Sequence, residues 1–286
     1  MKHLPTEIVL QIMGHLSKAD LMSVALVAFK YSTLARPFLF RRIQILSESS
    51  ELPDWISQIA ESDNALMIKV IEIGSHWNKS CLEGVRNLFQ AAVTLEELSI
   101  LPSHETIQLE LFDPAIVPNL RKFAITSHTD YTRLVVDFLP HLPKLIDLEV
   151  PHLGEQWAMQ SRFTSVIWQH GPSFMDRLDK FRGPPYFLQC MSKTGRALQH
   201  FSATKEITDR GLSFISKELG FREELLSLHI VIPVGYDNWS FSWVERQCIP
   251  PSLVPSLFPN LRSVAWFRVH HLLPERKPVS VVTAVH

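Results

Sequence analysis

The sequence predicts an α/β fold in which three short N-terminal helices precede an irregular solenoid, with strands on its inside and helices on its outside. Two observations carry this prediction. Apolar residues recur at helical spacing over roughly the first forty residues. A strand-like apolar pattern then returns about every 28 residues along the rest of the chain, as it does in repeat proteins.

The first helix is predicted from the spacing of apolar residues. Pro5 suits the first turn of a helix, where its missing N–H breaks no hydrogen bond. Ile8, Ile12 and Leu16 follow at intervals of four residues and form an apolar stripe. Three helices within about forty residues cannot bury all such side chains against one another. The patch that begins at Leu4 therefore packs either on the rest of the chain or on a partner.

Two further helices are predicted from capping and breaking signals. Ser17 and Asp20 have the three-residue spacing of a capping box, with Asp in place of the usual Glu, so a second helix is expected to follow. A third helix is expected over residues 29–35. It is expected to end by Pro37, because proline disfavours helical backbone at the residue before it.

The order of these residues resembles the F-box. The matching positions are Leu4-Pro5-x-Glu7-Ile8, Ile12, Leu16, Asp20-Leu21 and Leu26-Val27. The continuation is similar to the variant common in fungal F-box proteins and reads Leu34-Ala35-Arg36-Pro37-x-Leu39-Phe40, with Ile43. The chain departs from the family at Ala28 and Phe29, where Cys and a bulky aromatic are frequent. Because many spaced positions agree over residues 3–45, the resemblance is specific.

The resemblance implies that residues 1–45 bind a Skp-type adaptor, which joins F-box proteins to a cullin and to a RING subunit of a ubiquitin ligase. Ubiquitin transfer would then take place on the other subunits. Docking of this kind is helix-in-groove recognition, in which a few apolar anchors carry most of the affinity. The adaptor contacts that the motif implies are Leu4, Pro5, Ile8, Ile12, Leu16, Leu21, Leu26 and Val27. An F-box-containing interaction scaffold without a role in degradation is the alternative.

Residues 68–273 carry the recurring strand-like pattern, after a linker and a leading helix at residues 46–67. The pattern is apolar, two variable, apolar, one variable, and apolar or small. Its copies are Ile68-Ile71-Ile73, Leu95-Leu98-Ile100, Leu120-Phe123-Ile125, Leu145-Leu148-Val150, Leu178-Phe181-Gly183, Leu198-Phe201-Ala203, Leu225-Leu228-Ile230 and Leu261-Val264-Trp266. Three apolar positions coincide by chance at about one start in ten in so apolar a chain, so the pattern needs independent support.

Two further features support repeats. A lead-in phrase precedes three copies as Val117-Pro118-Asn119-Leu120-Arg121, Leu142-Pro143-Lys144-Leu145 and Phe258-Pro259-Asn260-Leu261-Arg262. Helix-period segments lie between strands at Leu82-Val85-Leu88-Phe89, Leu134-Val135-Phe138-Leu139 and Leu212-Ile215-Leu219. The spacing is typical of leucine-rich repeats, although the Asn or Cys that closes their turn is absent. We therefore predict a degenerate leucine-rich-repeat-like domain, with an irregular α/β layer as the alternative and a loose tail at residues 274–286.

In such a solenoid, the strand residues between the apolar positions line the concave face. Those predicted to bind a target protein are Glu97, Lys122, Asp147, Glu149, Lys180, Arg182, His200 and His229. Their mixed charge suits a protein surface better than a phosphate backbone. Tyr236, Trp239 and Trp243 are aromatic and lie in one segment, so they are candidates either for interface anchors or for a cap on the core.

Composition and motifs exclude several other functions. Lys plus Arg is 28 against 29 for Asp plus Glu, and a net charge of −1 gives no electrostatic footprint for nucleic acid. The start of the chain does not resemble a signal peptide and no apolar run reaches membrane-spanning length, so we expect an intracellular protein, cytoplasmic or nuclear, with no membrane partner. Three scattered Cys cannot build the zinc sites of a RING. Common catalytic motifs are absent, so we expect a non-catalytic subunit without cofactor or metal. An enzyme hidden in the irregular domain is the third hypothesis.

Overall fold

A computed structural model of the chain describes residues 4–46, 52–74, 79–101, 117–126, 134, 138–151, 175, 177–185, 188, 198–207, 209–217, 224–233, 253–269 and 279–284. The chain divides into two compact units. The first unit is Met1–Lys122 with Ser127–Thr129, and the second is Phe123–Thr126 with Asp130–His286.

The first unit combines three N-terminal helices with the beginning of a sheet. Its elements are α1 (Thr6–His15), α2 (Lys18–Val27), α3 (Phe29–Leu39), β1 (Arg42–Ile45), α4 (Leu52–Ala60), the 3-10 helix η1 (Asp63–Met67), β2 (Val70–Ile73), α5 (Lys79–Ala91) and β3 (Glu97–Ile100). Strand β4 (Lys122–Ile125) has residues in both units. The elements of the second unit are η5 (Leu139–His141), β5 (Asp147–Glu149), β6 (Lys180–Gly183), β7 (His200–Glu206), α9 (Asp209–Lys217), β8 (Ser227–Pro233), α11 (Leu253–Leu257), β9 (Ser263–Val269) and β10 (Val279–Ala284).

Helices α1 to α3 pack around a small apolar core. Met13, Leu21 and Ala35 are buried at its centre, so each of the three helices contributes one residue. Ser17 caps α2 as predicted: the Asp20 backbone N–H donates to the Ser17 hydroxyl at 3.2 Å, and that hydroxyl donates to the Asp20 carboxylate at 2.6 Å. The three predicted helices are therefore present, although α2 carries apolar residues on several sides.

Helix α3 differs from its prediction at Pro37. The prediction ended the helix before this residue, but the structure continues it to Leu39 with Pro37 inside. Proline removes one backbone hydrogen bond from a helix. Here the next turn still closes, because the Phe40 N–H donates to the Arg36 carbonyl at 3.0 Å. Phe38 and Leu39 also pack against the three-helix core, which offsets the lost bond.

The sheet begins inside the segment that the sequence assigned to the N-terminal helices. β1 follows α3 closely and pairs in parallel with β2, in the register Ile43↔Ile71 and Ile45↔Ile73. Phe40, Ile43 and Ile45 carry the same apolar spacing as the predicted repeats. Residues 42–45 therefore form a strand of the sheet that was not predicted, and α4 lies within residues 46–67, the segment predicted as a linker and leading helix.

The strand order in the sheet follows the chain order from β1 to β10. Every neighbouring pair from β1 to β9 whose register is described is parallel. Each of the eight predicted copies falls on a strand, β2 to β9. The middle apolar residues of the copies are partners in register, in one unit as Ile43↔Ile71↔Leu98 and in the other as Leu148↔Phe181↔Phe201↔Leu228↔Val264. The predicted repeat pattern is therefore the buried side of a largely parallel sheet.

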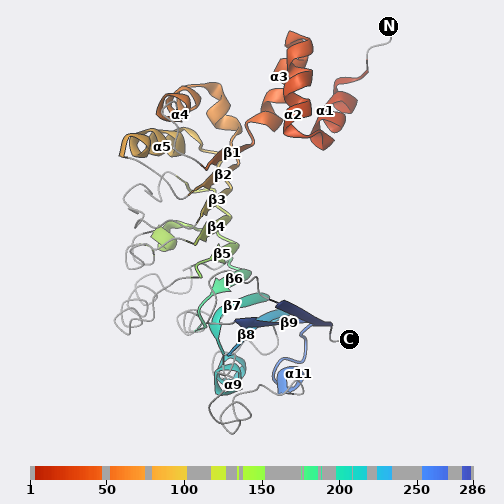
Figure 1. The fold of residues 1–286 in the computed structure, drawn as a ribbon, viewed down its shortest axis with the longest axis vertical. Helices are drawn as coiled ribbons and strands as arrows, with labels where there is room; N and C mark the ends of the chain where they lie inside the picture. The colour runs from red at the N-terminus through yellow and green to blue at the C-terminus, as the bar shows by residue number, and fades with distance from the viewer. Residues whose placement is uncertain are drawn as a thin grey trace. The chain divides into compact units, whose positions relative to one another are not determined.

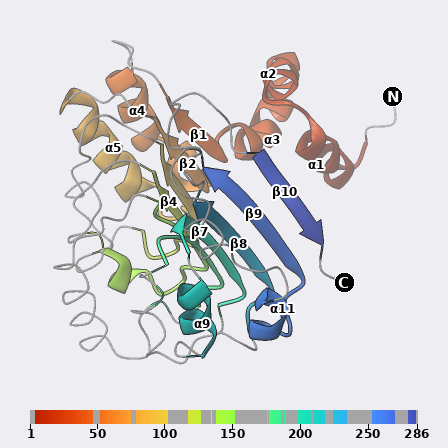
Figure 2. The same cartoon turned by 60° about the horizontal axis from the view of Figure 1, so that its bottom comes forward.

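The C-terminal tail is a second correction. The sequence predicted a loose tail from residue 274, but Val279–Ala284 forms β10. This strand pairs antiparallel with β9, in the register Val281↔Trp266, and the two run in opposite directions in Figure 2. Val279, Val281 and Val282 favour strand structure, and the charged and proline-containing stretch before them hid this signal.

The lead-in phrases form one kind of turn. In each phrase, the N–H of the leading leucine donates to the carbonyl of the residue three positions before it, which closes a four-residue turn. Proline is the second of these four residues, a turn position that its fixed φ favours. The three bonds are Leu120 N–H to Val117 O, Leu145 N–H to Leu142 O and Leu261 N–H to Phe258 O, each 3.2 Å. The repeated phrase therefore encodes a β-turn that delivers the chain into the next strand.

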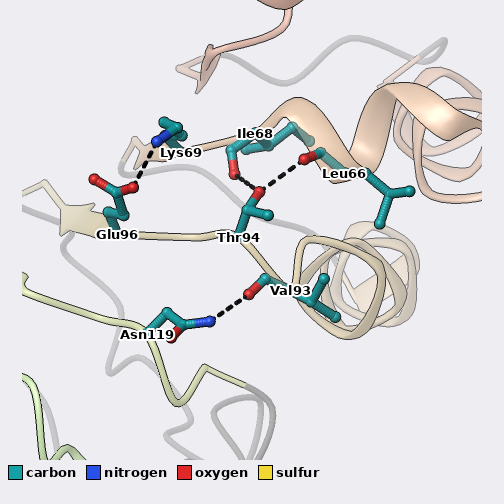
Figure 3. A network of polar contacts seen from close by, with 7 residues as sticks. All are labelled: Leu66, Ile68, Lys69, Val93, Thr94, Glu96 and Asn119. Atoms are coloured by element: carbon teal, nitrogen blue, oxygen red, sulfur yellow. Dashed lines mark hydrogen bonds and ion pairs between the residues drawn. The ribbon is translucent and has the colours of Figure 1, made fainter.

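A polar network joins successive repeats in the first unit (Figure 3). The Thr94 hydroxyl donates to the Leu66 and Ile68 carbonyls, both at 2.9 Å, and the Asn119 side-chain amide donates to the Val93 carbonyl at 2.9 Å. Thr94 and Asn119 occupy the same place, immediately before the leading leucine of a copy. Side chains at this position therefore satisfy backbone carbonyls of the preceding repeat.

Helices accompany the strands within each unit. In the first unit α4 and α5 lie side by side next to β1 to β3 (Figure 1), and Ile56 of α4 and Leu88 of α5 are fully buried. In the second unit α9 contacts α11, where the buried Ser216 hydroxyl donates to the Leu257 carbonyl at 2.7 Å. Of the helix predicted around residues 134–139, residues 135–137 lie outside the described residues.

Candidate functional site

An apolar patch on α1 is the first candidate site. Leu4, Ile8 and Ile12 are 58%, 42% and 48% exposed, and Pro5 beside them is also exposed. Ile8 and Ile12 share one face of α1 because their spacing of four residues is close to one helical turn, and Leu4 lies two residues before the helix begins at Thr6. The opposite face carries the buried Met13. These side chains stay exposed with the whole chain present, which favours a partner over packing on the rest of the chain.

A second apolar patch lies where α2 passes into α3. Leu26, Val27 and Phe29 are 88%, 73% and 84% exposed, and Met22 on α2 is 56% exposed. Exposed large apolar side chains that cluster in this way mark interaction surfaces. Leu26 and Val27 belong to the predicted contacts, whereas Met22 and Phe29 were not predicted. Their signal was present in the sequence, because both are apolar and lie outside the stripe that contains Leu21.

Two predicted contact residues pack in the three-helix core. Leu21 is only 5% exposed and lies at the centre of the three-helix core, so its side chain has almost no surface for a partner. Leu16 packs against the same core. Both side chains hold the helices together and thereby position the exposed residues.

The second candidate site is the polar face of β5 to β8, in the second unit. Along each strand the side chains alternate between the buried face and this polar face. The register places Asp147, Lys180 and His200 in one row across β5, β6 and β7. The next row contains Glu149, Arg182, Ser202 and His229. The structure therefore brings together six of the residues predicted for target binding.

Charge interactions link the second row. Arg182 Nη1 lies 2.9 Å from Glu149 Oε1, and the Arg182 side chain is still 57% exposed. Burial lowers the pKa of His229 below its ordinary value, and the positive charges of Arg182 and His200 lower it further. His229 is therefore neutral at pH 7 beside a permanent cation.

The other predicted target-binding residues are not part of this group. Glu97 and Lys122 lie on β3 and β4, half-buried on their strands. In the first unit the same kind of face has its own ion pair, in which Arg42 Nη2 lies 3.2 Å from Glu72 Oε1. Tyr236, Trp239 and Trp243 lie outside the described residues.

Among the residues that the structure places, no three His, Cys, Asp or Glu side chains are arranged to hold a metal ion. Within the same ranges no helix is both long and apolar enough to cross a membrane.

The position of the two apolar patches agrees with a comparison of the sequence with known families. Residues 1–45 match the family model described as F-box-like. The chain thus contains an F-box-like domain, over 45 of its 286 residues. No curated protein matches the chain. All the exposed residues of both apolar patches belong to the F-box-like domain, which suggests an adaptor-binding role in a Skp–cullin–F-box ubiquitin ligase.

Proposed function

We propose that this chain is the substrate-recognition subunit of a Skp–cullin–F-box ubiquitin ligase. Its F-box-like domain docks on a Skp-type adaptor, and the domain that follows holds the target protein. The observation that carries the proposal is the exposure of Leu4, Ile8 and Ile12, together with Leu26 and Val27, in a domain that matches the F-box-like family.

The two patches give the adaptor a discontinuous apolar surface. In the α1 patch, Ile8 and Ile12 are anchors one helical turn apart, the arrangement by which an amphipathic helix fills a groove, and Leu4 adds an exposed apolar side chain just before the helix. The patch around Leu26 and Val27 offers side chains that are almost fully exposed, so docking removes most of their apolar area from water. Leu16 and Leu21 support both patches from the core.

We further propose that the strand–helix repeats form a solenoid whose polar strand faces recognise the target. Two features support this: the strands follow one another in chain order, and equivalent residues of successive repeats are partners in register. The chain supplies no catalytic group in this proposal. It accelerates ubiquitin transfer by holding the target near the enzyme subunits, which is catalysis by proximity.

A direct connection between helices and sheet supports this role. α3 ends at Leu39 and β1 begins at Arg42, and the Arg41 carbonyl accepts the N–H groups of Lys69 and Val70 at 2.9 and 3.0 Å. The Gly74 N–H also donates to the Ile45 carbonyl at 2.6 Å. The F-box-like domain therefore continues into the sheet through paired backbone, and a docked adaptor is held in a fixed relation to the first repeats.

The test is affinity capture of the tagged full chain from cells that contain the adaptor and the cullin. The unmodified chain is expected to bring down both. The variant Leu4→Ala/Ile8→Ala/Ile12→Ala is expected to bring down neither. A matched control, Leu66→Ala/Val93→Ala, removes apolar side chains of similar exposure, 54% and 48%, outside the F-box-like domain and is expected to behave like the unmodified chain.

The outcomes separate the proposed function from its alternatives. Capture of the adaptor without the cullin would indicate an adaptor-bound scaffold in place of a ubiquitin-ligase subunit. Capture of neither protein by the unmodified chain would contradict adaptor docking altogether.

A further inference from the structure

We propose that the polar face of β6, β7 and β8 docks an extended acidic segment of a partner protein, through Lys180, Arg182, His200 and His229. This inference rests on the proposed target-binding role and deepens it, because it names the chemistry of the segment that this face holds.

The register of strands β6, β7 and β8 brings these four residues close together. Lys180 and Arg182 are exposed on β6, while Phe181 between them is buried. Lys180 is the partner of His200 on β7. Arg182 is the partner of Ser202 on β7, which in turn is the partner of His229 on β8. Because neighbouring strands lie about 4.8 Å apart, the four groups occupy a patch roughly 10 Å wide.

The patch has a one-sided charge. In the two rows that contain these four groups, no described residue from β6 to β9 is a carboxylate. One row is Lys180, His200, Ser227 and Ser263, and the other is Arg182, Ser202, His229 and Ala265. Glu206, at the end of β7 and in register with Val231, lies beyond these two rows. The nearest acids in register, Asp147 and Glu149, lie on β5 at one border. An incoming carboxylate therefore meets basic and hydroxyl groups over three strands.

Arg182 keeps capacity for a second carboxylate. Its contact with Glu149 is made through Nη1, and the side chain remains 57% exposed. A guanidinium has five N–H donors, so one ion pair leaves donors for another anion. The Glu149 contact also fixes the orientation of the guanidinium, which reduces the entropy lost on binding.

The electrostatics around His229 agree with an anionic partner. Its pKa is lowered by burial and then by the positive charges of Arg182 and His200, so this face opposes the addition of positive charge. A carboxylate placed beside Arg182 and His200 offsets the positive charges that act on His229. The acids at the β5 border suit the mixed side chains of a protein segment better than the uniform phosphates of a nucleic acid.

The size of the patch sets the length of the segment. An extended chain advances about 3.3 Å per residue, so roughly four residues cross β6, β7 and β8. Successive acidic side chains on one side of such a segment are about 6.6 Å apart, which matches the spacing of one to two strands.

The experiment titrates the full chain with a fluorescent peptide of about eight residues in which Glu and Ser alternate, long enough to span the patch. Anisotropy reports binding. Lys180→Gln/Arg182→Gln is expected to weaken binding about tenfold, because two charge-assisted contacts are lost. The matched control, Lys18→Gln/Arg86→Gln, removes two exposed basic side chains on helices α2 and α5 and is expected to leave the affinity unchanged.

Three results would overturn the inference: no binding of the Glu peptide by the unmodified chain, equal binding by both double variants, or tighter binding of a peptide with Lys in place of Glu. Binding of a phosphoserine peptide but not of the Glu peptide would also overturn it, in favour of a phosphate site. Capture of the adaptor by the same preparations separates the two proposals. If the chain binds the adaptor but not the peptide, only this inference is contradicted. If it binds the peptide through Lys180 and Arg182 but never the adaptor, the proposed ligase function is contradicted.

Discussion

Two isoleucines in the F-box-like domain are expected to respond in opposite ways to the same substitution. Ile43 lies on β1 and is 2% exposed, whereas Ile12 lies on α1 and is 48% exposed. Ile43 is in register with Ile71 of β2, so it belongs to the core of the sheet. Ile43→Ala is therefore expected to destabilise the fold, and Ile12→Ala to weaken adaptor binding.

The magnitudes follow from burial. Truncation of a buried isoleucine to alanine costs about 2–5 kcal/mol, a large share of the roughly 5–15 kcal/mol that stabilises a typical domain. Ile12 loses only about half of this apolar contact, and alanine is the better helix former by a few tenths of a kcal/mol. We therefore expect Ile12→Ala to change the free energy of unfolding by less than about 1 kcal/mol.

The assay is urea unfolding of the full chain, followed by circular dichroism, with the unmodified chain beside the two variants. A loss of at least about 2 kcal/mol for Ile43→Ala, and little for Ile12→Ala, agrees with a sheet that begins inside the F-box-like domain. If Ile43→Ala costs no more than Ile12→Ala, residues 42–45 are not part of the core, and the assignment of β1 is refuted.

Three further substitutions test other features of the fold. Gly74→Ala places a Cβ 2.8 Å from the Leu46 backbone, so thermal denaturation should show a destabilised protein, by about 1–3 kcal/mol; an unchanged melting temperature would contradict this close approach. Ser17→Ala removes the cap of α2 and should lower the free energy of unfolding in urea by about 1 kcal/mol; an unchanged free energy would contradict the stabilising role of the cap. The Lys69 hydrogen bond and charge hold the pKa of Glu96 below its ordinary 4.5, so the stability that Glu96 contributes is present above pH 4.5 and is lost as the pH falls through the lowered value. The difference in free energy of unfolding between the unmodified chain and Glu96→Gln should therefore shrink as the pH falls. A difference that grows would show that the pKa of Glu96 is not lowered.

Most strands could be predicted because each repeat has the same physical requirement. A residue such as Phe181 or Phe201 must be apolar to fill the interior side of a parallel sheet, and the two rings stack at a centroid distance of 5.9 Å. Three apolar positions per repeat therefore leave a signal in the sequence even where the turn residues have diverged. The proline-containing turns repeat for the same reason, since each must deliver a strand in register.

The misses have equally specific causes. β1 was missed because Phe40, Ile43 and Ile45 were assigned wholly to the F-box resemblance, although they carry the repeat spacing. The end of α3 was misplaced because proline is a local signal, while the burial that carries the helix past Pro37 comes from tertiary packing. Leu21 was predicted as an adaptor contact because it matches an F-box motif position, and the motif does not tell which of its apolar residues face the three-helix core.

The polar strand face could be predicted residue by residue but not as an arrangement. Alternation along a strand indicated that Arg182 and His229 are not in the core. Their proximity depends on the register of β6, β7 and β8, which is set by turns and segments between the strands. The ion pair of Arg182 with Glu149 and the lowered pKa of His229 follow from that register and are not visible in the sequence.

The central claim is that the exposed face of α1 binds a Skp-type adaptor, and calorimetric titration of the purified full chain with purified adaptor tests it most directly. Leu4, Ile8 and Ile12 are each about half exposed, and full burial of such side chains is worth about 1.5–3 kcal/mol each. Only the exposed half of each side chain can be newly buried by the adaptor, and alanine keeps the Cβ. The triple alanine variant should therefore lose about 2–3 kcal/mol of binding free energy, which is roughly a 30- to 150-fold loss of affinity. Leu66→Ala/Val93→Ala should bind like the unmodified chain. Equal affinities for the unmodified chain and the triple variant, with both folded, would contradict the account.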